Sequence, residues 1–361
     1  MKANLLRDEQ TIHLAPSASL QFNRWFWQEL SGLAKEVKGI LGEDLIAVVL
    51  GGSYGRDDGS VTSYKGHEWP CNDVDLFLIT TTAFPRGMQD LRELGRAYKE
   101  ELGIAVDFAR PQTLRMVRKW PCTLLWQELA LGHRVLYGPR DILLNHVPDR
   151  VFQPLPVVEA SRLLLDRGAG LVWARRILEE TDPCPDPAFV VRSYYRCAQA
   201  IADALLIAHG RYFYDPEERL QRILSLTPDH LILRETGAFW LLQSGIAFHH
   251  APESAGTINL RSCEKLAIVW LKAFLWIESA RLGENFQDAA EYAACPRRRE
   301  EHEEGVWQCI AANLRHGRLH WENPREQLYR TLPPAIDAMA RDNGMFPGAG
   351  AAALAAWRQS Q

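Results

Sequence analysis

Three short runs of apolar residues in the first third of the chain are typical of buried β-strands. They occupy residues 45–50, 74–79 and 104–108. Two amphipathic segments, 23–40 and 86–102, have the spacing of apolar residues that favours helices, and a glycine follows each of them within two residues. The order of helix, strand, long turn, strand, helix and strand predicts a small domain that contains both α and β structure.

The rest of the chain has the pattern of helices. Residues 114–133 are expected to form a helix broken or kinked at Pro121, and we predict no strand after Pro111. Prolines are frequent between residues 138 and 156, which marks the expected boundary between domains 1–140 and 157–361. Further helices are predicted at 157–180, 187–209, 216–225, 228–248, 261–282, 298–316 and 324–341.

The composition changes this picture little. With 361 residues, 47% of them hydrophobic and 24% charged, the chain resembles a globular protein of two domains. Its net charge of -4 supplies no overall positive field, so we expect no nucleic-acid partner. Seven scattered cysteines without a C-x-x-C pair argue against a disulfide framework or a structural zinc site. Because neither a signal-peptide run nor an apolar run of about 20 residues is present, we expect a cytoplasmic protein without membrane contact.

The strongest candidates for chemistry are three aspartates in or beside the predicted strands. Asp73 and Asp75 are two residues apart, so they should share one face of their strand, and Asp107 lies in the third strand. Clustered carboxylates repel each other unless a cation lies between them, and Mg²⁺ prefers oxygen ligands. We therefore expect a two-ion Mg²⁺ site on these aspartates. An exposed strand end with solvated carboxylates is the alternative interpretation.

The run Gly51-Gly52-Ser53 follows the first predicted strand. Glycine allows close approach of a ligand to the backbone, and exposed amides together with a serine hydroxyl suit phosphate oxygens. Arg56 and Lys65 are candidates to contact a triphosphate. The same residue types also form ordinary turns and solvated surfaces, which is the competing interpretation.

The sequence G-G-S, then D-V-D, then a strand aspartate resembles the nucleotidyltransferase superfamily typified by DNA polymerase beta and kanamycin nucleotidyltransferase. The resemblance covers roughly residues 45–110. It implies an α+β fold in which a small mixed-sheet catalytic domain precedes an all-α helical bundle. It also implies that Gly52 and Ser53 contact nucleotide phosphates, and that Asp73, Asp75 and Asp107 hold Mg²⁺ and carry the catalysis.

The activity implied by this resemblance is transfer of a nucleoside monophosphate from a nucleoside triphosphate, expected to be ATP, to a hydroxyl of a small molecule, with release of pyrophosphate. Two alternatives stay open. The acceptor could be a protein side chain, as in the AMPylating members of toxin–antitoxin systems. The chain could also be a member of the fold that binds a nucleotide or a partner without turnover.

Two further expectations concern the remainder of the chain. About twenty residues separate Ser53 from Asp73, more than is typical of the family, and the excess at 57–71 is expected to be a loop. Residues 190–222 are similar to the helical bundle of aminoglycoside-type members, so acceptor or partner binding is expected there. His249 and His250 are adjacent, so on a helix they should face different directions and form no metal pair.

Overall fold

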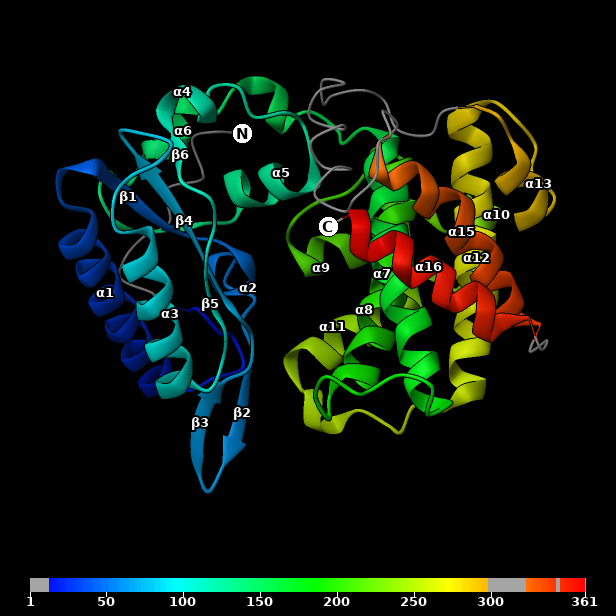
Figure 1. Cartoon of the computed structure of the whole chain (residues 1–361), viewed down its shortest axis with the longest axis horizontal. Helices are drawn as coiled ribbons and strands as arrows, with labels where there is room; N and C mark the ends of the chain where they lie inside the picture. Colours follow the sequence, from blue (N-terminus) through cyan, green and yellow to red (C-terminus); the bar gives the residue numbers. More distant parts are fainter. Residues whose placement is uncertain (1–12, 298–322, 342–344, 361) are drawn as a thin grey trace. The chain divides into compact units, whose positions relative to one another are not determined.

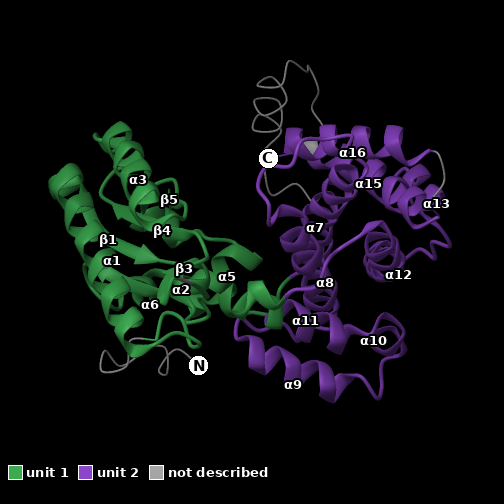
Figure 2. Ribbon diagram, turned by 90° about the horizontal axis from the view of Figure 1, so that it is seen from below, with its two compact units in different colours: residues 1–155, 247–254 green, residues 156–246, 255–361 purple. Residues whose placement is uncertain are grey.

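The computed structural model describes residues 13–297, 323–341 and 345–360, and it divides into two compact units (Figure 2). Unit 1 comprises residues 1–155 and 247–254, and unit 2 comprises residues 156–246 and 255–361. Residues 247–254 therefore belong with the N-terminal unit, although the sequence pattern placed them in the helical half. The helix predicted at 298–316 lies outside the described residues.

Unit 1 is built on a mixed sheet with the strand order β5-β4-β1-β7. Strand β1 (Leu45–Leu50) pairs antiparallel with both β4 (Val74–Thr80) and β7 (Arg134–Tyr137). Strand β5 (Val106–Phe108) and the short β6 (Gln112–Thr113) both run parallel to β4. The sheet is therefore mixed, as expected, and β1 and β4 are its buried central strands.

Helices cover both faces of this sheet (Figure 1). Helices α1 (Leu20–Leu41) and α3 (Met88–Leu102) share one core cluster with Leu76 and Leu78 of β4. Phe77 and Ile79 belong to a second cluster, because successive residues of a strand point to opposite faces. The second cluster includes residues of α4 (Leu114–Val117), α5 (Leu124–Leu131) and α6 (Ile142–His146). The predicted interruption at Pro121 is confirmed, since it lies between α4 and α5.

Two predictions about strands were wrong. The stretch expected to be a loop contains a hairpin of β2 (Val61–Tyr64) and β3 (His67–Pro70), which extends from the rest of unit 1 (Figure 1). Its alternation of polar and apolar residues is weak because the hairpin is largely exposed. Strand β7 was missed because it has only four residues, all half-buried, which give no continuous apolar run.

The described residues of unit 2 form helices and no strands. The helix predicted at 228–248 is divided at Gly237, which follows the end of α10 (Leu231–Thr236). Its φ of 64° is in the left-handed region, a conformation that glycine adopts readily at the end of a helix. A C-terminal helix, α16, was not predicted. The helices are α7 (Val157–Leu178), α8 (Phe189–Ala208), α9 (Pro216–Leu226), α10 (Leu231–Thr236), α11 (Ala238–His250, whose last four residues belong to unit 1), α12 (Leu260–Leu282), α13 (Ala289–Ala294), α15 (Pro324–Ala340) and α16 (Phe346–Ser360).

The remaining short helices are α2 (Gly52–Gly55) and the 3₁₀ turns Gly42–Asp44, Asp149–Phe152 and Pro252–Ser254. In unit 2, α7 and α12 approach closely where Gly168 lies against the ring of Trp270, whose indole N–H donates to the carbonyl of Leu164. Among the helices of the described residues, none is both long enough and apolar enough to cross a bilayer.

Candidate functional site

The sheet register brings the predicted aspartates together. Asp75 of β4 and Asp107 of β5 are directly paired Cα partners on parallel strands. Paired residues on neighbouring strands point to the same face of a sheet, so both carboxylates lie on one face. Asp73 lies just before β4 and two residues from Asp75, so in an extended segment the two side chains point to the same side. Asp73 and Asp107 are exposed and Asp75 is half-buried, which leaves these carboxylates accessible to a ligand.

The glycine turn lies against this face. The backbone N–H of Gly51 donates to the carbonyl of Asp75 at 2.9 Å. Gly52 has a φ of 61°, and a β-carbon at this position would overlap the carboxylate oxygen Oδ2 of Asp75. Only glycine meets both conditions, because other residues are strained at positive φ and carry that β-carbon. Ser53 follows immediately at the start of α2 and is 8% exposed.

These residues fit Mg²⁺ by the chemistry of their donor atoms. The ligands available are carboxylate oxygens, which are the oxygen donors that Mg²⁺ uses together with water and substrate phosphates. Asp73, Asp75 and Asp107 are not, however, a group whose ligating oxygens all lie within 4.8 Å of one another.

Arg56 and Lys65, the two residues proposed for triphosphate binding, make other contacts or lie elsewhere in unit 1. Arg56 forms an ion pair with Glu128 of α5, with a distance of 3.0 Å between Nη1 and Oε2. Its neighbour Asp57 binds the guanidinium of Arg134 through both oxygens. Lys65 is exposed at the tip of the β2–β3 hairpin, at the end of four-residue strands that span about 10 Å. The structure therefore does not bring Lys65 to the carboxylates.

Tyr54, which follows Ser53, anchors the glycine turn in the core of unit 1. Its ring is fully buried in the core, and its hydroxyl donates to the carbonyl of Ser60. The same hydroxyl accepts the backbone N–H groups of Cys71 and Asn72. Burial raises the pKa of the Tyr54 phenol well above its usual range, so this hydroxyl keeps its proton at neutral pH. Tyr54 therefore connects the end of α2 to both ends of the hairpin.

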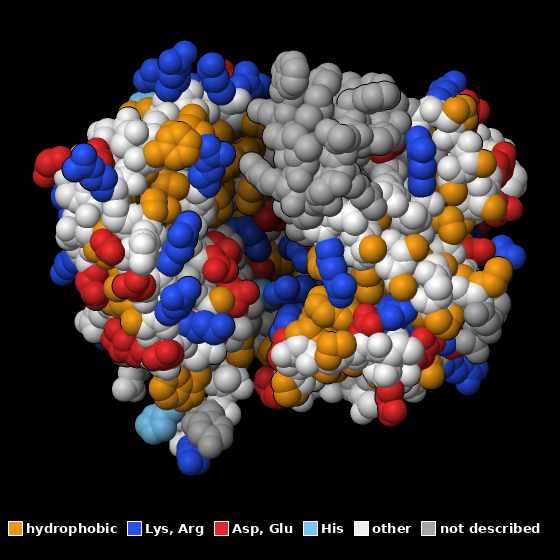
Figure 3. Space-filling model, viewed as in Figure 1, with side chains coloured by type: hydrophobic (Ala, Val, Ile, Leu, Met, Phe, Trp, Pro, Cys, Tyr) orange, Lys and Arg blue, Asp and Glu red, His pale blue; other side chains and the backbone are white. Residues whose placement is uncertain are grey.

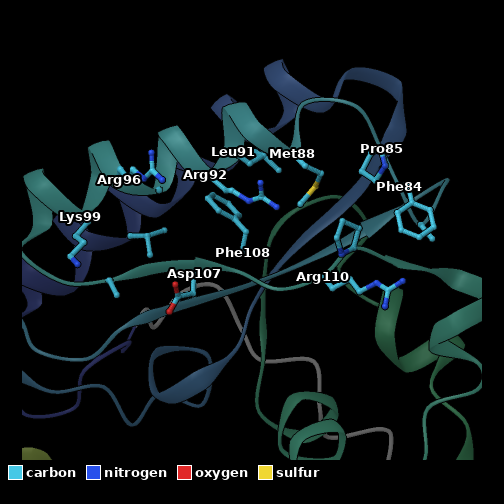
Figure 4. Close-up of a pocket in the computed structure, with 15 residues that line it drawn as sticks. Phe84, Pro85, Met88, Leu91, Arg92, Arg96, Lys99, Asp107, Phe108 and Arg110 are labelled. Atoms are coloured by element: carbon cyan, nitrogen blue, oxygen red, sulfur yellow. The ribbon is translucent and has the colours of Figure 1, made fainter. Parts of the chain in front are cut away.

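A cavity of about 670 Å³ lies beside the edge strand β5 and under α3 (Figure 4). The basic residues of α3 that line it, Arg92, Arg96 and Lys99, recur at the spacing of one helix face. Figure 3 shows Lys and Arg side chains over this part of unit 1. Asp107 of β5 also lines the cavity, so the cavity reaches one of the three predicted aspartates (Figure 4). Sequence reasoning missed it, although the spacing of the three cations was visible.

A second polar cluster in unit 1 was also missed. Asp58 follows the glycine turn and is 8% exposed, and its Oδ1 lies 2.7 Å from Nε2 of His250. Nε2 of His249 lies 3.6 Å from Oδ2 of Asp58 and also contacts the backbone carbonyl of Asp58. The expectation that the two histidines would diverge was therefore wrong. They lie in the last turn of α11, and their rings reach Asp58 from two sides.

The cluster has an electrostatic consequence for Asp58. Burial opposes ionisation of this carboxyl, but the hydrogen bond from His250 and the nearby charges of His249 and Arg56 lower its pKa below the ordinary value. Burial lowers the pKa of His249 as well, which favours its neutral imidazole. A buried carboxylate facing imidazole nitrogens is thus present at neutral pH.

A comparison of the chain with models of protein families and with curated proteins gave no match to either.

Proposed function

We propose that this protein is a nucleotidyltransferase that transfers a nucleoside monophosphate from a nucleoside triphosphate, with ATP as the first candidate, to a hydroxyl of a small-molecule acceptor. The observation that carries the proposal is the contact of the Gly51–Gly52 turn with Asp75, which is itself paired with Asp107. A turn suited to phosphate oxygens therefore lies in contact with a carboxylate suited to Mg²⁺.

Each residue has a distinct role in this proposal. The amides of the turn and the hydroxyl of Ser53 would donate to phosphate oxygens, and Gly52 would allow the nucleotide to approach the backbone. Asp73, Asp75 and Asp107 would hold Mg²⁺, which when bound neutralises charge on the triphosphate. Asp107 is exposed and would accept the proton of the acceptor hydroxyl.

The proposed reaction is an attack of the acceptor hydroxyl on the α-phosphorus of the nucleoside triphosphate. The acceptor oxygen forms a bond to the α-phosphorus, and the bond from that phosphorus to the bridging oxygen breaks. Pyrophosphate leaves with the electron pair of the broken bond, and the acceptor proton passes to the carboxylate of Asp107. The chain's main contribution would be to orient the two substrates and to stabilise the developing charge.

The first test is isothermal titration of the full chain with a non-hydrolysable ATP analogue, with and without Mg²⁺. The proposal requires binding that depends on Mg²⁺ and that Asp75→Asn abolishes. A matched control is Asp229→Asn, at an exposed position of unit 2, which should bind as the wild type does. Binding of neither ATP nor GTP analogues would overturn the proposal.

A second experiment tests the reaction. Pyrophosphate release from ATP is followed while pools of hydroxyl-bearing small molecules are added, and α-labelled ATP reports where the nucleotide goes. Label in a small molecule supports the proposed acceptor class. Label in protein would assign a protein acceptor instead, and nucleotide binding without any transfer would indicate a non-catalytic member of the fold.

A further inference from the structure

We propose that Asp58, His249 and His250 form a second metal site in unit 1, one that binds a divalent transition-metal ion such as Zn²⁺. One ligating atom from each residue can be chosen so that all of them lie within 4.8 Å of one another. Among the described residues, no other group of three or more His, Cys, Asp and Glu side chains meets that condition. All of them belong to unit 1.

The donor set distinguishes this site from the aspartates of the sheet. Two imidazole nitrogens and one carboxylate oxygen suit borderline ions such as Zn²⁺, whereas Mg²⁺ prefers oxygen ligands alone. With three protein ligands, a tetrahedral ion would keep one position for water. The proposal does not depend on the nucleotidyltransferase activity, because it rests on different residues and a different ion.

The spacing of the atoms is close to what such an ion requires. Ligands about 2.0–2.1 Å from a tetrahedral Zn²⁺ are about 3.3 Å from each other. Nε2 of His249 already lies 3.6 Å from Oδ2 of Asp58, whereas Nε2 of His250 lies 2.7 Å from Oδ1. Both separations are within about 1 Å of that value, and the ligating atoms of all three residues lie within 4.8 Å of one another.

Metal binding would replace hydrogen bonds by coordination bonds. The contacts of Nε2 of His249 with the Asp58 carbonyl and of Nε2 of His250 with the Asp58 carboxylate are hydrogen bonds that place a proton between the partners. A ring nitrogen must present its lone pair to a metal, so any proton on it moves to the other nitrogen or to solvent. Binding should therefore release protons wherever a histidine is charged beforehand.

The position of Asp58 gives the site a structural consequence. The backbone N–H of Asp58 donates to the carbonyl of Ser53 at 2.9 Å, and Gly59 donates to the carbonyl of Leu14. An ion on Asp58 would therefore fix the segment directly after the glycine turn and hold residues 247–254 against it. We expect the ion to raise the thermal stability of unit 1 because the folded arrangement binds it more tightly than the unfolded chain does.

The test is isothermal titration of the full chain, without a histidine tag and after chelator treatment, with Zn²⁺. We expect binding of one ion per chain that millimolar Mg²⁺ does not displace. Asp58→Asn and His250→Asn should each weaken Zn²⁺ binding at least about tenfold. His209→Asn is the control, because His209 and His230 also lie close, at 4.3 Å between ring centroids, but have no third ligand within the same limit in the part of the chain that the structure describes.

A second measurement needs no variant. Co²⁺ in place of Zn²⁺ should give the visible absorption bands of a histidine-ligated site on the wild-type protein, and Zn²⁺ should bleach them. Absence of both the bands and the binding heat would overturn the proposal and leave the cluster as a set of hydrogen bonds. Equal Zn²⁺ affinity in the wild type and in folded Asp58→Asn and His250→Asn proteins would also overturn it, because the ion would then bind elsewhere.

Discussion

Gly52 lies so close to Asp75 that no side chain fits between the backbone of one and the carboxylate of the other. The hydrogen bond from Gly51 to the Asp75 carbonyl fixes the same approach from the preceding residue. Because the turn and the carboxylate are in contact, a substitution in one should change the position of the other.

Gly52→Ala should lower both stability and nucleotide binding. Alanine would be strained at a φ of 61° and would displace the Asp75 carboxylate. We expect a loss of about 2–4 kcal/mol in the free energy of unfolding and no measurable binding of the ATP analogue. Gly66→Ala is a matched control, since its φ is 79° but its β-carbon would have open space. Equal losses in the two variants, measured by urea unfolding, would contradict the role given to the Asp75 contact.

Asp75→Asn should separate stability from metal binding. Removing one of the clustered negative charges relieves repulsion, so we expect the melting temperature without metal to be unchanged or raised. Added Mg²⁺ should raise the melting temperature of the wild type and leave that of Asp75→Asn unaffected. Thermal unfolding with and without Mg²⁺ measures both effects. A variant that responds to Mg²⁺ as the wild type does would remove Asp75 from the metal site.

Glu278 should be essential to the stability of unit 2. It is fully buried, and it accepts hydrogen bonds from Ser161 of α7, Arg281 of α12 and Tyr292 of α13. Glu278→Gln would leave the largely buried Arg281 without its counter-charge, and we expect a loss of about 3 kcal/mol in the free energy of unfolding. Chemical denaturation followed by circular dichroism measures this loss.

An exposed ion pair provides the control for Glu278. Glu284 pairs with Arg297, and both side chains are about half exposed, at 42% and 54%. Solvent screening reduces the value of such a pair to about 0–1 kcal/mol, so Glu284→Gln should be nearly neutral. A comparable loss from both substitutions would show that burial of the Glu278 cluster is not what makes it important.

His209 should make unit 2 less stable in mild acid. Burial lowers the pKa of this imidazole below its usual value, outweighing its hydrogen bond with the Leu205 carbonyl, and the nearby His230 lowers it further. The unfolded chain then binds a proton at a higher pH than the folded one does. Stability should therefore be complete above about pH 6.5 and fall as the pH decreases from there towards the lowered folded-state pKa.

The measurement is the free energy of unfolding at pH 7.5 and at pH 5.5. His209→Phe keeps a ring stacked on Trp276, which lies 5.2 Å from His209 between ring centroids, but it cannot take up a proton. We expect the difference between the two pH values to be smaller in His209→Phe than in the wild type. His67→Gln, at an exposed position of the hairpin, should retain the wild-type difference. A wild-type pH dependence in His209→Phe would assign the effect to other groups.

The central strands could be predicted from the sequence because burial on both faces favours an apolar side chain at almost every position. Leu45–Leu50 and the run from Val74 are apolar almost throughout, and both were predicted correctly. The hairpin could not be predicted in this way, since Ser63 and His67 are exposed and core packing does not dictate their identity. Strand β7 owes its place to pairing with β1, a tertiary interaction that its four residues do not reveal.

The carboxylate face and the histidine cluster differ in the same respect. Asp73 and Asp75 are two residues apart, so the geometry of a single strand predicts that they share a face. Asp58 and His250 are separated by 192 positions, and nothing in the local sequence links them. Adjacent residues on a helix leave its axis in different directions, yet the rings of His249 and His250 both reach Asp58, whose carbonyl and carboxylate accept their hydrogen bonds.

The hydroxyl of Tyr54 has a consequence for how this chain can vary. It holds Ser60, Cys71 and Asn72, and the backbone N–H of Cys71 also donates to the carbonyl of Ser60. The two ends of the hairpin are therefore fastened to each other and to the core, whatever lies between them. Away from those ends, Lys65 and Gly66 form the exposed tip of the hairpin, so we expect changes in the length of the tip to leave the register of the strand that carries Asp75 unchanged.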